Sequence, residues 1–83
     1  MFKTTVKIDG MACSMCEAHI NDAIRKAFPG AKKVSSSHGR GESSFVTETA
    51  VEEQEIRRAI EATGYTFLSS QCVPWEKKGL FGR

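Results

Sequence analysis

Two cysteines, Cys13 and Cys16, stand close together in the stretch GMACSMC, just before a segment with helical spacing. Ser14 and Glu17 have the spacing of a capping box, which predicts Ser14 as the N-cap of a helix that begins between the two sulfurs. Backbone N–H groups at a helix start lack intrahelical partners and the dipole there is positive, so both favour the thiolate over the thiol. The spacing therefore predicts two activated sulfurs in one surface loop, close enough to share one ion.

A pair of thiolates is a soft ligand set. Cu(I) is therefore the expected ion, with Zn(II) and other thiophilic ions behind it. A structural zinc normally takes four ligands, whereas the chain has three cysteines and a single CxxC pair. An exposed site with two thiolates is better suited to passing an ion on than to retaining it.

The elements that must position this loop can be predicted from the periodicity of apolar residues. Strands are predicted where apolar residues alternate or flank glycine turns, over residues 2–8, 31–38, 43–49 and 65–72. Helices are predicted over 16–28 and 51–63, where apolar residues recur with helical spacing. Pro29-Gly30 ends the first helix, Thr49 and Glu52 form a capping box before the second, and Gly64 ends it.

This order of elements is β-α-β-β-α-β. Each β-α pair needs a crossover, and the right-handed rule brings both helices to one face of the sheet. The fold class is therefore α+β, a ferredoxin-like βαββαβ sandwich with a four-stranded antiparallel sheet. The inward side chains of the first strand are expected to be Phe2, Thr4, Val6 and Ile8.

The composition sets further limits. The 83 residues suit one small domain, expected over residues 1–72, with a C-terminal tail over 73–83. No apolar run is long enough for a signal peptide or a membrane span, so we expect a soluble cytoplasmic protein with reduced thiols. The net charge is only +2 and the basic residues are not clustered, which argues against nucleic acid as a partner. The lack of a long apolar run argues against stable membrane insertion.

The stretch GMACSMC after a first strand resembles the GMxCxxC motif of the heavy-metal-associated domain family, and the resemblance extends over about residues 2–71. This family includes small copper chaperones, N-terminal modules of copper-exporting P-type ATPases and mercury-binding proteins. The resemblance implies that Cys13 and Cys16 are the metal ligands. It also implies that Met11 is a buried anchor rather than a ligand and that Tyr65 lies beneath the metal loop.

The function implied by the resemblance is binding and transfer of a soft metal ion, without enzymatic activity. The expected role is that of a cytosolic Cu(I) chaperone that hands the ion to a partner by thiolate exchange. The partner would be a metal-transporting P-type ATPase or another metal-binding domain, and a metal-bridged homodimer is a further option. A mercury or zinc carrier of the same fold remains open, because the ligand pair alone does not separate Cu(I), Zn(II) and Hg(II).

Other residues near the pair are given simpler interpretations. Met15 is expected to be exposed or half-packed, and His19 to be a flanking histidine rather than a third ligand. Cys72 is expected at the far end of the last strand as a free thiol remote from the pair. The tail carries Trp75, Leu80 and Phe81 around Lys77 and Lys78, and is expected to pack on the sheet or to fray.

A glutaredoxin-like thiol oxidoreductase is the alternative from another class of protein, because its CxxC also lies at a helix start after a first strand. Two features of the sequence count against it. The predicted hairpin follows the first helix, which is the wrong place for that fold. In addition, no proline stands before a strand in the middle of the chain, where that fold presents a cis-proline beside its cysteines.

Overall fold

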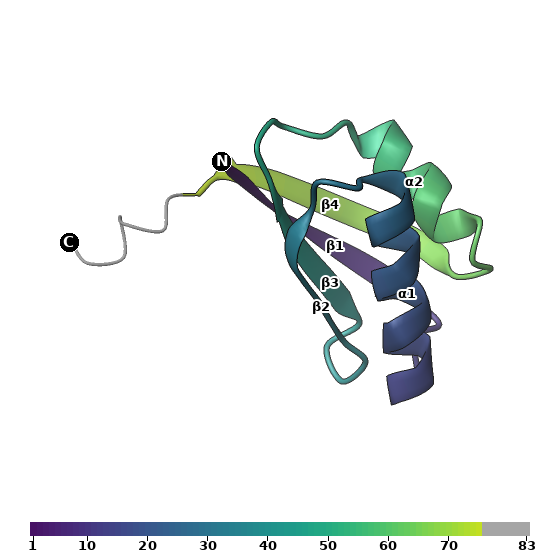
Figure 1. Cartoon of the computed structure of the whole chain (residues 1–83). Coiled ribbons are helices and arrows are strands. Elements are labelled where there is room, and N and C mark those ends of the chain that lie inside the picture. Colours follow the sequence, from purple (N-terminus) through teal and green to yellow (C-terminus); the bar gives the residue numbers. More distant parts are fainter. Residues whose placement is uncertain (76–83) are drawn as a thin grey trace.

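The computed structural model describes residues 1–75 of the chain and confirms the predicted βαββαβ order (Figure 1). The elements are β1 (Phe2–Asp9), α1 (Ser14–Ala27), β2 (Lys32–Ser37), β3 (Glu42–Thr47), α2 (Glu53–Glu61) and β4 (Thr66–Pro74). The sheet has the order β2-β3-β1-β4, and all three pairs of neighbouring strands are antiparallel. Both helices cover one face of this sheet. Within residues 1–75, neither helix is long and apolar enough to cross a membrane.

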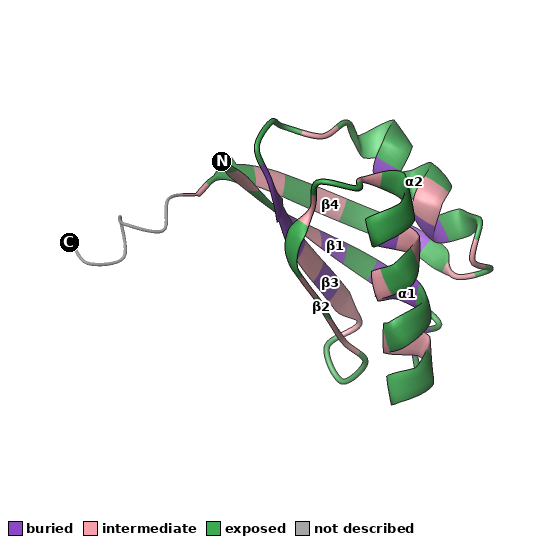
Figure 2. Ribbon diagram, in the orientation of Figure 1, coloured by how far each residue is buried: buried purple, intermediate pink, exposed green. Residues whose placement is uncertain are grey.

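The core lies between the helices and the sheet, and its strand contribution follows the predicted alternation. Along β1, Thr4, Val6 and Ile8 are buried and Phe2 is half-buried, whereas Lys3 and Lys7 are exposed, because successive side chains of a strand point to opposite faces. Figure 2 shows buried and more exposed positions alternating along β1. The buried apolar cluster draws on both layers and consists of Val6, Ile8, Met11, Ile20, Ile24, Phe45, Ile56, Ile60 and Phe67. This cluster fixes α1, whose first turn carries the cysteines, on the sheet.

The turn between β2 and β3 is fastened to the end of β1. The N–H of Ile8 donates to the carbonyl oxygen of Gly41 at 2.8 Å, and the N–H of Gly41 donates to the carbonyl oxygen of Ser37 at 2.9 Å. Gly41 has a φ of +67°, and a Cβ at this position would lie 3.1 Å from the Ile8 carbonyl oxygen. The close approach and the left-handed backbone both require glycine here.

Both predicted capping boxes are wrong. The N-cap of α1 is Cys13, the helix starts at Ser14, and no side chain caps it. The carboxylate of Glu17 does not turn back to the N-cap, because it accepts hydrogen bonds from His38 in the hairpin turn.

The second helix also begins later than predicted. The N-cap of α2 is Glu52, which has no side-chain cap hydrogen bond, and the helix begins at Glu53 instead of residue 51. Val51 packs against the core from a position before the helix. Gly64 has a φ of +95° just beyond the helix, as expected of a residue that ends it.

The last strand extends two residues further than the predicted 65–72. Phe2 pairs with Pro74, and the N–H of Trp75 donates to the carbonyl oxygen of Met1 at 2.9 Å. Trp75 is half-buried, and the ammonium group of Lys33 lies 6.0 Å from the centre of its ring. The remaining residues of the predicted tail, Lys77, Lys78, Leu80 and Phe81, lie outside the described residues.

Candidate metal site

The loop that carries the cysteines begins with a bend at Gly10. Simple alternation beyond β1 would turn Met11 away from the core, but Gly10 has a φ of +98° and reverses this direction. Met11 is 5% exposed and belongs to the core cluster, which confirms its predicted burial. A Cβ at Gly10 would lie 3.4 Å from Cδ1 of Tyr65, so the chain passes directly over the tyrosine ring.

The structure brings the two predicted ligands together. Cys13 is the exposed N-cap of α1, and Cys16 lies in the first turn, half-buried against the core. Their Sγ atoms are 3.3 Å apart and both thiols are free. The N–H of Glu17 donates to the carbonyl oxygen of Cys13 at 3.2 Å, which closes the single helical turn that carries both sulfurs.

The surroundings of Cys16 stabilise its thiolate. A hydrogen bond with the side chain of Tyr65 is the largest cause, followed by bonds with the main chain of Ala12 and the side chain of Cys13. Together these contacts lower the pKa of Cys16 from 9.0 to about 7, against a smaller opposing effect of desolvation. The same contact with Cys16 raises the pKa of Tyr65. These contacts favour the thiolate of Cys16, which is the form that binds soft metals.

Tyr65 lies where the family resemblance implied. It is half-buried and packs against the core cluster at the entry to β4, and its side chain is the largest cause of the lowered pKa of Cys16. The side chain of Tyr65 therefore packs beneath the cysteine loop and also favours the thiolate form of Cys16.

Three other residues named from the sequence, Met15, His19 and Cys72, lie in different surroundings. Met15 is 67% exposed, and His19 is an exposed residue at one end of a cleft between the helices. Cys72 lies on β4 opposite Thr4, whereas the metal loop follows the opposite end of β1. Among residues 1–75, no three His, Cys, Asp or Glu side chains are grouped so that they could hold an ion.

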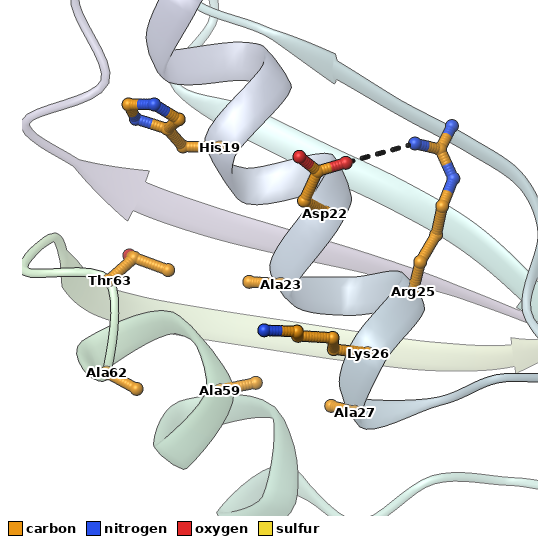
Figure 3. A pocket seen from close by; sticks show the side chains of 9 residues that line it. All are labelled: His19, Asp22, Ala23, Arg25, Lys26, Ala27, Ala59, Ala62 and Thr63. Carbon is orange, nitrogen blue, oxygen red and sulfur yellow. Dashed lines mark ion pairs between the residues drawn. The ribbon is translucent and has the colours of Figure 1, made fainter.

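The cleft between α1 and α2 has a volume of about 930 Å³ (Figure 3). Its lining residues are His19, Asp22, Ala23, Arg25, Lys26, Ala27, Ala59, Ala62 and Thr63. Asp22 is 3.5 Å from Arg25 in an ion pair along α1. The cleft contains no sulfur ligand and is a feature separate from the thiol pair.

One contact at the site was not predicted from the sequence. Oε2 of Glu17 accepts the main-chain N–H of His38 at 2.7 Å and the ring Nδ1–H of His38 at 2.6 Å. The main-chain bond is the larger cause, and the side-chain bond the next, by which the pKa of Glu17 is lowered. The two residues are 21 positions apart, and no local pattern in the sequence signals that they meet.

Comparison with known proteins is consistent with this geometry. A family profile described as the heavy-metal-associated domain matches residues 5–66. The chain belongs to the heavy-metal-associated domain family.

Similar sequences and solved structures come from several kinds of metal-related proteins. A mercuric reductase from Lysinibacillus sphaericus is 38% identical over 65 residues, which are 78% of this chain and 12% of that protein. A copper binding domain from HMA7, a P-type ATPase, has a TM-score of 0.70 and 26% identity, with 86% of this chain and 99% of that chain covered. The CopZ metallochaperone has a TM-score of 0.70 and 21% identity, with 80% and 98% covered. This chain spans about an eighth of the length of the mercuric reductase.

Proposed function

We propose that this protein binds a soft metal ion between Cys13 and Cys16 and transfers it to a partner by thiolate exchange. The observation that carries the proposal is the geometry of the pair, with two free sulfurs 3.3 Å apart on the first turn of a helix. The contact of Cys16 with Tyr65 supports it, because a donor beside the sulfur favours the thiolate that a metal requires.

The two cysteines have different roles in this proposal. With metal–sulfur bonds of about 2.3 Å, the length found for zinc, a linear two-sulfur complex places the sulfurs about 4.6 Å apart. The pair must therefore open when the ion enters. Cys16 is held by the core and by Tyr65, whereas Cys13 is exposed at the N-cap. The side chain of Cys13 is therefore the one that moves when the ion enters. A partner can approach the ion from the same exposed side of the site.

Transfer then proceeds by ligand replacement. A thiolate of the partner binds the ion as a third ligand, and Cys13 leaves because its side chain has the fewest contacts. A second partner thiolate then replaces Cys16. The ion keeps its charge throughout, so the exchange needs no oxidant or reductant.

Cu(I) is the ion that we propose first, since thiolates select it and two sulfurs are a sufficient ligand set. The role would be that of a cytoplasmic chaperone for a P-type ATPase or another metal-binding domain. The fold shared with the HMA7 copper binding domain and with CopZ supports this assignment. Hg(II) is the second candidate, favoured by the 38% identity with a mercuric reductase. Zn(II) is less well matched, because zinc prefers four ligands.

A competition titration tests the choice of ion. Reduced protein is titrated with Cu(I), Hg(II) and Zn(II), each against a chelator of known affinity, with Cys13→Ser as the control. We expect one Cu(I) per chain, much weaker Zn(II) binding and no tight binding by the variant. Tight Zn(II) binding that does not depend on Cys13 would refute the proposed site. Retention of Hg(II) in the presence of Cu(I)-buffering ligands would favour the second candidate.

Disulfide chemistry remains the competing interpretation of a CxxC pair. The antiparallel sheet with both helices on one face is not the fold of a glutaredoxin, and it presents no cis-proline within residues 1–75. We therefore expect poor reduction of a glutathione mixed disulfide by the reduced protein. Turnover comparable to that of a glutaredoxin would reverse the order of the two hypotheses.

A further inference from the structure

Glu17 connects the cysteine turn to a distant part of the chain through both its main chain and its side chain. Its N–H donates to the carbonyl oxygen of Cys13, within the turn that carries both sulfurs. Its carboxylate oxygen Oε2 accepts two hydrogen bonds from His38, one from the main chain and one from the ring. One residue thus holds the start of α1 to the turn between β2 and β3.

The hairpin that carries His38 is itself firmly held. The hydrogen bond from Ile8 to Gly41 attaches the turn to the end of β1, and the hydrogen bond from Gly41 to Ser37 closes the turn itself. One helical turn further along α1, Oγ of Ser36 donates to Oδ1 of Asn21 at 2.6 Å. This bond is a second polar contact between α1 and the hairpin formed by β2 and β3. His38 is therefore presented from a fixed support.

The position of this contact matters because the start of α1 lacks a side-chain cap. Cys13 is the N-cap, and no side chain caps α1. The exposed first turn of a helix frays readily when its N–H groups lack partners. The core and Tyr65 hold Cys16 on one side of the turn, and the contact of Glu17 with His38 holds the other.

We propose that Glu17 and His38 are positioning residues of the metal site, which keep the first turn of α1 ordered so that Cys13 and Cys16 converge on one ion. This inference rests on the proposed function of the cysteine pair. Neither side chain contacts the ion. Loss of the contact leaves the fold intact and loosens the turn, so the bound ion is held less tightly.

The test uses the full, reduced chain and five variants. Glu17→Ala removes the acceptor of both hydrogen bonds, and His38→Ala removes only the ring donor. His38→Asn keeps a short N–H donor on the side chain. The double variant Glu17→Ala/His38→Ala completes a cycle, and Asp22→Asn breaks the ion pair with Arg25 on the same helix as a matched control.

Three measurements are made on each variant. Cu(I) affinity is measured by chelator competition, and thermal melts report global stability. Amide hydrogen exchange at residue 17 reports the order of the cysteine turn without any metal. We expect Glu17→Ala and His38→Ala each to weaken Cu(I) binding about three- to tenfold, in keeping with the net contribution of a typical hydrogen bond. We expect His38→Ala to lower the protection of the Glu17 amide by a similar factor.

The pattern across variants distinguishes positioning from general destabilisation. The double variant should bind Cu(I) no more weakly than Glu17→Ala, and His38→Asn should recover affinity to within about twofold of the unmodified chain, because its amide can replace the ring donor. Asp22→Asn should match the unmodified chain.

Two outcomes overturn the inference alone: unchanged affinity and amide protection in His38→Ala, or fully additive losses in the double variant. Failure of the unmodified chain to bind Cu(I) or Hg(II) overturns the proposed function, and this inference with it.

Discussion

Cys16 and Cys72 are both half-buried free thiols, yet they lie in different chemical settings. Cys16 stands at the start of a helix, with its Sγ 3.3 Å from a second sulfur, and the side chain of Tyr65 is the largest cause of its lowered pKa. Cys72 stands within β4, opposite Thr4 on β1. Exposure alone would not separate the two. The difference comes from the neighbours that the fold supplies, which at Cys16 are a helix N-terminus, a hydroxyl donor and another thiol.

The sheet register also separates the two thiols in space. β4 begins with Thr66 beside Asp9, the end of β1 that leads into the metal loop, and runs toward Pro74 beside Phe2. Because a strand rises about 3.3 Å per residue, the six positions from residue 66 to Cys72 correspond to roughly 20 Å. Cys72 therefore lies toward the other end of the sheet and cannot share an ion with the pair.

The largest expected effect comes from removing one thiol at a time. Cys13→Ser and Cys16→Ser should each weaken Cu(I) binding by about a hundredfold or more, because a hydroxyl is a poor ligand for a soft ion. Cys72→Ser should bind Cu(I) as the unmodified chain does. Competition titrations on the three variants, with circular dichroism to check folding, provide the test. Loss of the ion from the Cys72 variant alone would remove the distinction between the two regions.

An intermediate effect is expected from Met11, which supports the cysteine loop from the core. Met11→Ala should lower the free energy of unfolding by about 2–5 kcal/mol, because it leaves a cavity at a buried site. Met11→Leu keeps the volume and should cost less than about 1.5 kcal/mol. Urea denaturation measures both values.

The same two variants separate an anchor from a ligand. Met11→Leu has no sulfur, so an anchoring role predicts unchanged Cu(I) affinity in a chelator competition. A stable Met11→Leu protein that binds Cu(I) tenfold more weakly would make the thioether a ligand, and the account of the loop would have to change.

The smallest expected effect concerns the electrostatic part of the comparison. The pKa of Cys16 is lowered to about 7 chiefly by its hydrogen bond with Tyr65, so Cys16 should react with iodoacetamide at neutral pH. Tyr65→Phe removes this donor to the thiolate, and the midpoint of the pH profile should therefore rise toward 9.0, the ordinary value for cysteine. Peptide mapping by mass spectrometry assigns the alkylation to Cys16. An unchanged midpoint in Tyr65→Phe would mean that the main chain of the loop and the Cys13 thiol lower the pKa of Cys16 without Tyr65.

Much of the fold could be predicted because each strand and helix shows its own spacing of apolar residues in the sequence. The alternation in β1 predicted the burial of Thr4, Val6 and Ile8, and the apolar spacing of α1 predicted the buried face that contains Ile20 and Ile24. Such patterns depend only on the pitch of each element.

The finer arrangement of the site depends on partners that are distant in the sequence. The capping box at Glu17 failed because His38, 21 residues away, offers the carboxylate two donors. The place of Tyr65 beside Cys16 came from the family resemblance, since nothing near residue 65 in the sequence points to a cysteine 49 positions earlier. The direction of Met11 depends on one left-handed residue, Gly10, which alternation alone does not account for.

X-ray absorption at the copper edge tests the central claim most directly. Reduced protein is loaded with less than one equivalent of Cu(I) at low concentration, so that one chain holds one ion. The account predicts a coordination shell of two sulfur atoms from Cys13 and Cys16, present in Cys72→Ser and lost when both Cys13 and Cys16 are replaced by serine. A shell that contains a histidine nitrogen, or a sulfur shell that survives the double replacement, would contradict it.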